Sequence, residues 1–597
     1  STLAVPSNPP GTIQASSVGW IMNTGGCETG PAVPKPGNHN IVYANCKGRF
    51  GVFNKLTGTE KAYYVGAANL YGHNPRDLKF RFQRVAPIHV SPHDPDVVYH
   101  GSQFLHRTTD DGKTWETISP DLTAFEDDKQ VISGSPITRD ITGEEYYSTL
   151  YSIRESPVKP GVIWTGANDG PVYVTPDNGV YWKNVTPKKL PAGGRVDAVE
   201  PSPHNPAKAY VAVLRYQLGD TKPYIYKTTD YGKTWELLTN GENGIAEDVP
   251  TRVIREHPEK EGLLFAGTER GVFVSFDDGK KWRSFQQNLP ITPVTDLKVH
   301  RGDLVLSTMG RGFWIADDIN TLLSFDLFKD TKLVVPATEI RKRQVFMRVG
   351  GRSIPQYTAP SLTIDYYLKE KTATGLKLEL LDANGRVVNI YYSDTTGHKL
   401  KTEVIEDMGL NTQTVIIDKR LRNKKGLNRF EWDMTAAGPW HKNDNRRFKN
   451  GPTVIPGKYT ARLTVGGQIL EQQFELEADL QLNETNTTLE DIKEQYQFAL
   501  KLGQLLSEAR QLEDRLNKEL KKLNKVNGQV SDRKATLEKV LADLRKKDIT
   551  YPQPKLIDQI EYLYGMTNRA DQAMGKDAYE QLEALSGAFE GIKSKIH

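Results

Sequence analysis

Loops that follow short apolar segments of this chain carry arginine, carboxylate and tyrosine side chains of the kinds that bind glycans or peptides. Arginine binds carboxylates through two parallel hydrogen bonds, and polar groups placed among aromatic rings orient a ligand. The turn pattern described below places these loops on one face, around a central channel. The residues of this candidate ligand-binding face are Arg139, Asp140, Glu144, Tyr147, Asp169, Arg195, Asp197, Arg215, Arg252, Glu269, Arg270 and Arg311.

The same face could instead hydrolyse a glycoside, which requires a close pair of carboxylates, or a tyrosine nucleophile with a carboxylate. A sialidase-type site would also need three arginines that converge on one carboxylate of the substrate. The spacing along the sequence selects no pair and no triad, and an ordinary solvated charge is the simpler interpretation of any single residue. The candidates for acid, base or nucleophile are Glu144, Glu145, Asp169, Asp197, Glu269 and Tyr147.

Nothing in the sequence indicates a metal or a cofactor. It has no nucleotide-binding loop, no zinc-ligand spacing and no G-x-S-x-G nucleophile motif. His89, His93, His100 and His106 lie close together, but alternate strand positions and a turn explain them without a metal. We therefore expect neither metal nor cofactor.

Four stretches repeat the pattern Ser or Thr, any residue, Asp, any residue, Gly, two residues, Trp, at 108–115, 175–182, 228–235 and 275–282. Asp bonds its own backbone in turns, Gly supplies a positive φ, and Trp buries a large flat surface. We interpret each box as a hairpin whose Trp fastens the turn to its sheet. The structural residues of the boxes are Asp110, Gly112, Trp115, Asp177, Gly179, Trp182, Asp230, Gly232, Trp235, Asp277, Gly279 and Trp282.

The boxes set the expected architecture of residues 1–325. Each closes a unit of four short strands, and successive box aspartates are 67, 53 and 47 residues apart. Similar units without a good box cover about 20–65 and 294–318. This period predicts a β-propeller with about six blades, possibly part of a larger ring. If each box joins the third strand to the fourth, the candidate ligand-binding face lies on the opposite side.

Two further domains are expected after the repeats. Short alternating strands predict an immunoglobulin-like β-sandwich over 326–480. Apolar residues at a spacing of three and four predict a helical bundle or antiparallel coiled coil over 481–597, which starts at a capping signal, Thr488 to Asp491. The apolar seam is interrupted at Glu519. Self-packing is the simpler role of these helices, and docking to another subunit is the alternative.

The chain has two cysteines, Cys27 and Cys46. A hairpin that pairs Val33 with Asn40 would put them opposite each other, within reach of a disulfide. Two free thiols are the alternative. A disulfide would favour an extracytoplasmic location, which means periplasmic, cell-surface or secreted.

Length and composition exclude some classes of function. With 597 residues the chain needs several cores, and a net charge of +4 does not favour nucleic acid as a partner. No apolar run is long enough to span a membrane. Because the chain starts at Ser1 without a signal-peptide pattern, we expect a processed or truncated product.

The box resembles the Asp box, or neuraminidase repeat, of sialidase-like and sortilin-like propellers. Over the whole chain, the sequence resembles the C-terminal part of a bacterial family named as glycosyl hydrolases with neuraminidase repeats, or as sortilin-like propeller proteins. The resemblance implies that further blades precede Ser1. It is carried by residues 26–30, 43–50, 133–140, 209–216 and 551–560.

Two functions remain after these observations. We expect an extracytoplasmic propeller protein that binds a glycan or peptide and acts as a scaffold, with the sandwich or the helices docking to protein partners. The alternative is a sialidase-type glycoside hydrolase on the same face. Fold alone does not decide between them, so enzymatic activity stays open. Three arginines converging beside a Tyr–Glu pair would favour the hydrolase.

Overall fold

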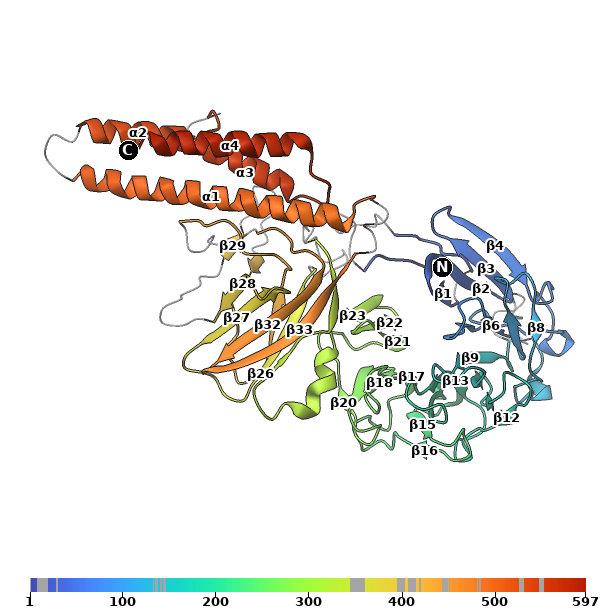
Figure 1. Ribbon diagram of the computed structural model, residues 1–597. Coiled ribbons are helices and arrows are strands. Elements are labelled where there is room, and N and C mark those ends of the chain that lie inside the picture. Colours follow the sequence, from blue (N-terminus) through green and yellow to red (C-terminus); the bar gives the residue numbers. More distant parts are fainter. Residues whose placement is uncertain are drawn as a thin grey trace. The chain divides into compact units, whose positions relative to one another are not determined.

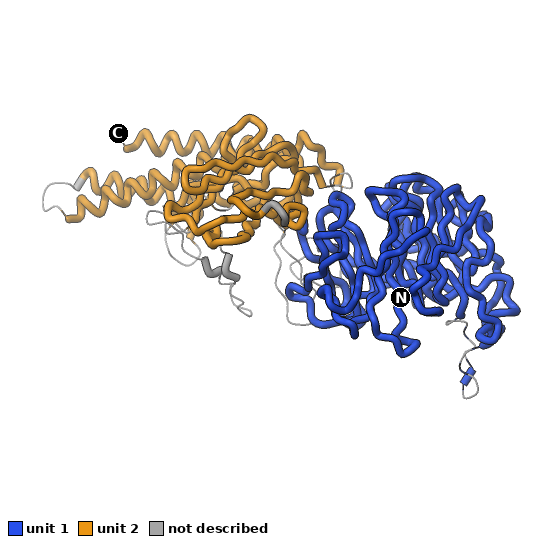
Figure 2. Tube along the Cα trace, turned by 90° about the horizontal axis from the view of Figure 1, so that it is seen from below, with its two compact units in different colours: residues 1–7, 17–319 blue, residues 8–16, 320–597 orange. Residues whose placement is uncertain are grey.

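The computed structural model describes residues 2–7, 20–27, 30–132, 134, 138–139, 142, 146–343, 360–393, 403–405, 415–417, 420–442, 449, 451–479, 482, 485–525, 531–546 and 552–596. The chain forms two compact units, of which unit 1 ends at Ile319 and unit 2 continues from Asn320 (Figure 2). The fold is mainly β, with four helices at the C-terminal end (Figure 1). Asp140, Glu144 and Glu145 lie outside the described residues.

Unit 1 consists of six small antiparallel sheets, numbered here in chain order, in which strands adjacent in sequence are also adjacent in the sheet. The first strand of each sheet contacts the first strand of the next, as expected for a β-propeller. Figure 1 shows the sheets following one another along an arc from blue to green. The strands are β1 (Ala32–Lys35), β2 (Asn38–Cys46), β3 (Arg49–Asn54) and β4 (Thr59–Tyr64) in sheet 1; β5 (Ile88–Val90), β6 (Val98–Gly101), β7 (Leu105–Thr108) and β8 (Glu116–Thr117) in sheet 2; β9 (Leu150–Glu155), β10 (Ile163–Ala167), β11 (Val172–Thr175) and β12 (Lys183–Asn184) in sheet 3; β13 (Arg195–Pro201), β14 (Ala209–Leu214), β15 (Tyr224–Thr228) and β16 (Glu236–Leu237) in sheet 4; β17 (Thr251–Glu256), β18 (Leu264–Thr268), β19 (Gly271–Ser275) and β20 (Arg283–Ser284) in sheet 5; and β21 (Val294–His300), β22 (Asp303–Thr308) and β23 (Phe313–Ala316) in sheet 6.

Each of the four boxes forms the turn between the third and fourth strands of its sheet, in sheets 2 to 5. In every box the hydroxyl group accepts a hydrogen bond from the glycine N–H at 2.9–3.0 Å. The aspartate accepts one from the N–H four residues later at 2.9 Å. The residue between Asp and Gly is left-handed in each case: Asp111 (φ 57°), Asn178 (61°), Tyr231 (57°) and Asp278 (59°).

Three box tryptophans also fasten their sheet to the preceding sheet, a contact that the turn pattern did not specify. Each donates a hydrogen bond from Nε1 to the carbonyl that directly follows the fourth strand of the preceding sheet. The box glycine makes room for this contact: a Cβ on Gly232 would lie 2.5 Å from the Val185 side chain. The three bonds run from Trp182 to Ile118 (2.8 Å), from Trp235 to Val185 (2.6 Å) and from Trp282 to Leu238 (3.1 Å).

The first box is joined differently. Trp115 packs edge-to-face on Phe50 of sheet 1, with ring centroids 5.1 Å apart, and its Nε1 is buried without a hydrogen-bond acceptor among the described residues. Asp111 instead accepts hydrogen bonds from the Tyr43 hydroxyl (2.5 Å) and Lys35 Nζ (3.0 Å) of sheet 1. Sheets 1 and 2 are therefore joined by aromatic packing and charged hydrogen bonds.

Cys27 and Cys46 form a disulfide, with their Cα atoms 5.1 Å apart. The hairpin register that led to this expectation was wrong, because Val33 pairs with Tyr43 rather than with Asn40. The expected register holds beside the turn, where Lys35 pairs with Asn38. An irregularity between Pro34 and Lys35 shifts the remaining pairs of β1 and β2 by three residues, so that Pro34 pairs with Val42. Proline has no N–H for the ladder, so a shift beside it is not costly.

The β-sheets of unit 2 share one cluster of buried apolar residues, to which a three-stranded and a five-stranded sheet both contribute. The pair β29 (Glu403–Ile405) and β30 (Val415–Ile417) is separate. A 3-10 helix, Asn320–Leu327, precedes the sheets. The three-stranded sheet contains β24 (Lys332–Val334), β26 (Leu362–Leu368) and β31 (Gly426–Trp432); the five-stranded sheet contains β25 (Thr338–Arg341), β33 (Gln468–Ala478), β32 (Gly457–Val465), β27 (Leu376–Asp382) and β28 (Val387–Tyr392).

The four helices pack around their own apolar core. The expected capping signal is present: Thr488 accepts from the Asp491 N–H (3.1 Å), and Asp491 accepts from the Thr488 N–H (2.8 Å). Glu519, at the interruption in the seam, bonds Arg533 of the next helix at 3.0 Å. No helix in the described part of the chain is long and apolar enough to cross a bilayer. The helices are α1 (Leu489–Leu523), α2 (Ser531–Leu544), α3 (Leu556–Thr567) and α4 (Lys576–Ser594).

The box contacts predict different effects of the same substitution in two boxes. Trp235→Phe removes the donor of a partly buried hydrogen bond and leaves the Val185 carbonyl without this partner, whereas Trp115→Phe removes a donor that has no acceptor among the described residues. We expect Trp235→Phe to lower the free energy of unfolding by about 1 kcal/mol more than Trp115→Phe does. Urea unfolding followed by tryptophan fluorescence measures this difference. Equal losses in the two variants would contradict the assignment.

Candidate functional site

The structure brings four residues of the candidate ligand-binding face together: Arg195, Asp197, Arg252 and Glu269. Arg195 and Asp197 lie at the start of β13, Arg252 lies at the start of β17, and Glu269 follows β18. Arg195 is paired with Asp197, and Arg252 is paired with Glu269. Arg252 Nη1 also lies 3.9 Å from Asp197 Oδ2, so the four side chains form one chain of alternating charges.

Burial changes the ionisation of this group. Burial raises the pKa of Asp197, although Arg195 and Arg252 oppose the shift, and Glu269 raises the pKa further. The Arg195 guanidinium also lies 4.5 Å from the centre of the Tyr151 ring. Since both arginines are directed at carboxylates of the protein, this cluster does not have the three converging arginines of a sialidase-type site.

Several other predicted residues have structural partners. Arg215 donates to the carbonyls of residues 191–193 at 2.7–2.9 Å and to Asp220 at 2.8 Å. Asp169 is buried and accepts from the backbone N–H groups of residues 124 and 125 at 2.9 and 3.3 Å, and burial raises its pKa. Burial also raises the pKa of Tyr147, with Asp169 as the next cause. These contacts hold the loops in place.

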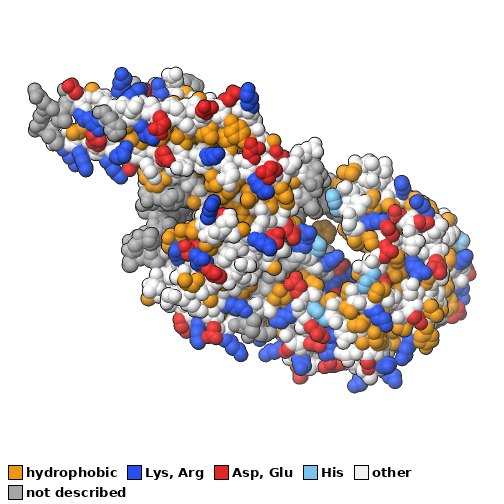
Figure 3. All heavy atoms as spheres, in the orientation of Figure 1, with side chains coloured by type: hydrophobic (Ala, Val, Ile, Leu, Met, Phe, Trp, Pro, Cys, Tyr) orange, Lys and Arg blue, Asp and Glu red, His pale blue; other side chains and the backbone are white. Residues whose placement is uncertain are grey.

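The remaining arginines are dispersed. Arg270 forms an exposed pair with Asp248 at 2.6 Å, and Arg139 and Arg311 are exposed. Acidic and basic side chains are mixed over the face seen in Figure 3, without a large region of one sign. Of the predicted residues that the structure describes, four therefore form a connected cluster, and Asp140 and Glu144 lie outside the described residues.

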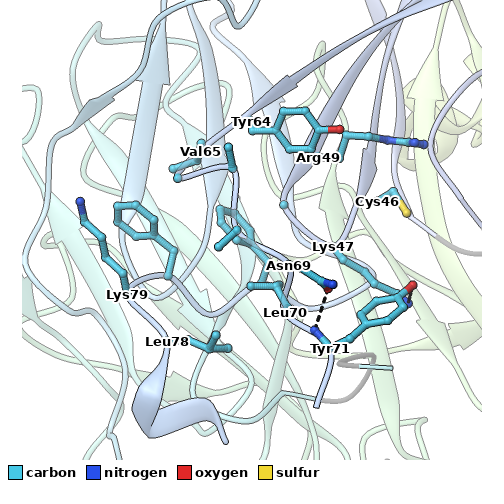
Figure 4. Close-up of a pocket in the computed structure, with 16 residues that line it drawn as sticks. Cys46, Lys47, Arg49, Tyr64, Val65, Asn69, Leu70, Tyr71, Leu78 and Lys79 are labelled. Carbon is cyan, nitrogen blue, oxygen red and sulfur yellow. Dashed lines mark hydrogen bonds between the residues drawn. The ribbon is translucent and has the colours of Figure 1, made fainter. Parts of the chain in front are cut away.

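A cavity of about 270 Å³ lies beside sheet 1, at residues that the sequence reasoning did not select (Figure 4). It opens next to the turn between β2 and β3. Residues 65–82 follow β4 and have no periodic pattern, so the sequence contains little signal for this site. The residues that line the cavity, called the sheet 1 pocket, are Cys46, Lys47, Gly48, Arg49, Tyr64, Val65, Gly66, Ala67, Ala68, Asn69, Leu70, Tyr71, Leu78, Lys79, Phe80 and Phe82.

Aromatic rings form much of the apolar lining of the sheet 1 pocket, and cationic side chains form much of its polar lining. Lys47 Nζ donates to the Tyr71 hydroxyl at 3.1 Å, and the Tyr71 N–H donates to Asn69 Oδ1 at 3.0 Å (Figure 4). Lys79 Nζ lies 5.1 Å from the centre of the Phe80 ring. Tyr64 and Tyr71 are 51% and 55% exposed, and Lys47 Nζ lies over one face of the Tyr71 ring, 4.5 Å from its centre. The Tyr64 ring and the other face of the Tyr71 ring are therefore the surfaces on which a ligand could stack.

The wall of the pocket depends on a glycine. Gly48 has φ 87°, and a Cβ there would lie 2.5 Å from the Phe82 ring. Phe82 in turn stacks on His100, with ring centroids 5.1 Å apart. His100 Nδ1 bonds the Pro87 carbonyl at 3.1 Å and therefore donates, which leaves its buried Nε2 unprotonated and without a partner among the described residues.

The histidines behind this wall are held neutral. Burial lowers the pKa of His100 to about 4, and burial together with His100 lowers the pKa of His106 to about 3. A folded-state pKa below the ordinary value means that the unfolded chain binds protons first on acidification. Acid therefore weakens the support of the pocket wall.

Comparisons with known proteins give similarity without a family assignment. No family model matches the chain. A curated protein, the probable oligoxyloglucan-reducing end-specific xyloglucanase of Neosartorya fischeri, is 24% identical over 261 residues. This match covers 38% of the present chain and 30% of that relative. The expected resemblance to glycosyl hydrolase-like proteins is thus supported, and the sortilin-like designation stays a prediction.

Solved structures are similar at a low level. The GH74 xyloglucanase from Xanthomonas campestris is 12% identical, and the match covers 72% of this chain and 70% of that chain with a TM-score of 0.34. PorZ, a surface component of the type-IX secretion system of Porphyromonas gingivalis, is 13% identical, with coverage of 75% and 61% and a TM-score of 0.34.

The buried histidines predict a pH dependence of stability. Stability is full above the unfolded pKa of about 6.5 and is lost as the pH falls toward 4, by about 1.4 kcal/mol for His100 over the first pH unit. We expect the thermal unfolding midpoint to drop between pH 7.5 and 5.5, and to drop less in His100→Phe. His39→Phe is the control, because the His39 side chain is exposed beside a hairpin turn. Equal drops in the two variants would contradict the prediction.

Proposed function

We propose that this chain is an extracytoplasmic binding and scaffold protein whose sheet 1 pocket holds a glycan or peptide ligand. The observation that carries the proposal is the composition of the pocket. Exposed Tyr64, Tyr71 and Lys79, together with the half-buried Lys47, surround a concave site of a size suited to one sugar ring or side chain. Aromatic rings stack on the apolar faces of sugars and side chains, and the lysines bind hydroxyl or carboxylate oxygens.

The lining of the sheet 1 pocket favours binding over hydrolysis because it contains no carboxylate among the described residues. Among the sixteen described residues that line it, none is Asp or Glu. Glycoside hydrolysis uses a pair of carboxylates, or a tyrosine assisted by a carboxylate, on either side of the scissile bond. A ligand in this pocket would therefore meet stacking and cationic groups without an acid–base pair.

We further propose the finer architecture that supports this role. Sheets 1 to 6 are blades of an Asp-box propeller over residues 1–325, alone or within a larger ring. Residues 326–480 form an immunoglobulin-like sandwich and 481–597 a helical bundle, and these parts dock to protein partners. The disulfide between Cys27 and Cys46 supports an extracytoplasmic location, since such bonds persist in oxidising compartments.

The test of the binding role is a glycan array combined with a peptide library, followed by calorimetry on the best ligand. Tyr71→Ala is expected to weaken binding about tenfold or more, because a stacked aromatic ring contributes on the order of 1–3 kcal/mol. Tyr181→Ala is the matched control, since Tyr181 is 61% exposed on a box turn of sheet 3. Binding that both variants weaken equally, or that neither weakens, would exclude the sheet 1 pocket.

One observation favours the hydrolase as a second candidate. Asp197 and Glu269 both contact Arg252, and burial raises the pKa of Asp197. Two carboxylates whose environments separate their pKa values can act as general acid and general base. If the cluster is catalytic, it hydrolyses a glycoside bound over the start of β13 and β17.

A screen of fluorogenic glycosides tests this second candidate. If a substrate is turned over, Glu269→Gln is expected to lower kcat by about a hundredfold or more, and Asp197→Asn to lower it similarly. Asp248→Asn is the control, because that carboxylate pairs with Arg270 on the surface. Turnover that survives Glu269→Gln, or the absence of any turnover, would exclude catalysis by this pair.

A further inference from the structure

The inner strands of sheets 2 to 6 each place one ionisable residue at an equivalent position. In sheets 2 to 5 the first and second strands are joined by a turn that is closed by a backbone hydrogen bond. In sheet 2, for example, the Ser91 N–H donates to the Val97 carbonyl at 2.9 Å. The ionisable residue lies two positions before the donor of this hydrogen bond. Each also lies opposite a large side chain of the second strand. The pairs are His89 with Tyr99, Arg154 with Trp164, Glu200 with Tyr210, Arg255 with Phe265 and Lys298 with Val305.

This common register makes the five residues neighbours. The strands that carry them, β5, β9, β13, β17 and β21, contact one another in that order. We call the set His89, Arg154, Glu200, Arg255 and Lys298 the inner ring. Because the chain runs in the same direction in all five strands, the inner ring lies toward the end of each strand, on the side of unit 1 where the boxes lie.

The charges of the inner ring are not balanced. Arg255 contacts both nearby carboxylates, Asp296 at 2.7 Å and Glu200 at 3.4 Å. Its Nε also donates to the Leu297 carbonyl at 3.0 Å. Glu200 of the inner ring and the nearby Asp296 are therefore both directed at one of the three permanent cations of the ring, Arg255.

Arg154 and Lys298 are the two cations left over. Within the described part of unit 1, no ion pair involves either of them, and the hydrogen bond of Arg154 goes to the carbonyl of the adjacent Ile153 at 3.3 Å. His89 is stacked on Tyr99, and its Nε2 is buried without a partner among the described residues. Three donors from three different sheets thus have capacity for an acceptor.

The ionisation of these side chains agrees with a positive local potential. Burial, then Arg154, Lys298 and Arg255, lower the pKa of His89. Burial and the neighbouring cations also lower the pKa of Lys298 and of Arg154. The charged groups that face His89 from the neighbouring strands are therefore mainly cationic, and Glu200 and Asp296 only partly offset them.

We propose that Arg154, Lys298 and His89 bind an oxyanion, either a carboxylate or a tetrahedral sulfate or phosphate group, inside the ring of inner strands. The guanidinium group and the ammonium group supply charge, and the imidazole, as its Nε2–H tautomer, supplies a directed hydrogen bond. Arg255 is held by Glu200 and Asp296 and does not contact the anion.

This site is distinct from the sheet 1 pocket and from the Arg195–Glu269 cluster. The latter lies at the start of β13 and β17, whereas the inner ring lies near their ends. Ligand binding in the sheet 1 pocket and anion binding in the inner ring can therefore be tested, and disproved, separately. An anionic ligand such as an acidic or sulfated glycan, or a peptide carboxylate, is the class that fits the inner ring.

Calorimetric titration of the whole chain at constant ionic strength tests the proposal. Inorganic phosphate and sulfate represent the tetrahedral anions, and acetate and glucuronate represent the carboxylates. Binding of either class supports the proposal and identifies the source. No heat with any of the four anions, tested to about 10 mM, would overturn it.

Variants separate the inner ring from other cations. Lys298→Met is expected to weaken anion binding about tenfold to a hundredfold, and Arg154→Met at least as much, which is the range for a lost charge-assisted hydrogen bond. Lys298 is more accessible to solvent than Arg154, so its variant tests the site even if Arg154→Met fails to fold. Lys280→Met, at an exposed position on a box turn, is the control and should bind normally.

A readout from His89 completes the test. A bound anion offsets the cations around the imidazole, so the pKa of His89 should rise when the anion binds. Imidazole NMR signals, assigned with His89→Gln, report this shift as a function of pH. The proposal is wrong if Lys298→Met binds as the unaltered protein does, or if the His89 signals do not respond to a bound anion.

Discussion

Unit 1 depends on the joint between one small sheet and the next. A single sheet of four short strands cannot bury its apolar faces alone, so each sheet is stable only against its neighbours. In three joints a box tryptophan donates to the carbonyl that ends the preceding sheet, and the box glycine lets the two backbones approach. The hydrogen bonds within each box join nearby residues, but they also position the tryptophan that contacts the preceding sheet. They therefore help to set the distance between neighbouring sheets.

The spacing of the sheets places ionisable side chains of the inner strands on two sides of unit 1. Since the joints repeat the same contact, the inner strands contact one another in sequence order and share a common register. Residues near the start of these strands, such as Asp197 and Arg252, meet on one side. Residues near the end, such as Glu200 and Arg255, meet on the other. The box is thus a structural element, and it affects function only by aligning the inner strands that carry these side chains.

Local patterns predicted local features well. The turn chemistry of the boxes, their place between third and fourth strands and the capping of α1 at Thr488 follow from a few adjacent residues. The acceptor of Trp235 could not be predicted, because Val185 lies 50 residues away in another sheet. The register of β1 was missed because Pro34 shifts it, and no pattern marks a bulge.

The candidate site was harder to predict for a related reason. Arg270 and Arg195 look alike in the sequence, yet one forms an exposed pair and the other joins a buried cluster. The sheet 1 pocket lies in a stretch without periodicity. A signal for the inner ring did exist, since counting two residues back from each repeated Ser-Pro-His turn reaches His89 and Glu200.

The joint at Trp115 lacks the tryptophan hydrogen bond that links sheets 2 to 5 to one another. Sheet 1 instead shares a buried apolar cluster with sheet 2, in which Phe50 packs with Ile88. Asp111 adds charged hydrogen bonds to this joint, as Asp278 does between sheets 4 and 5. Apolar contact and the residue between Asp and Gly of the box can therefore hold two sheets together where the tryptophan has no acceptor among the described residues.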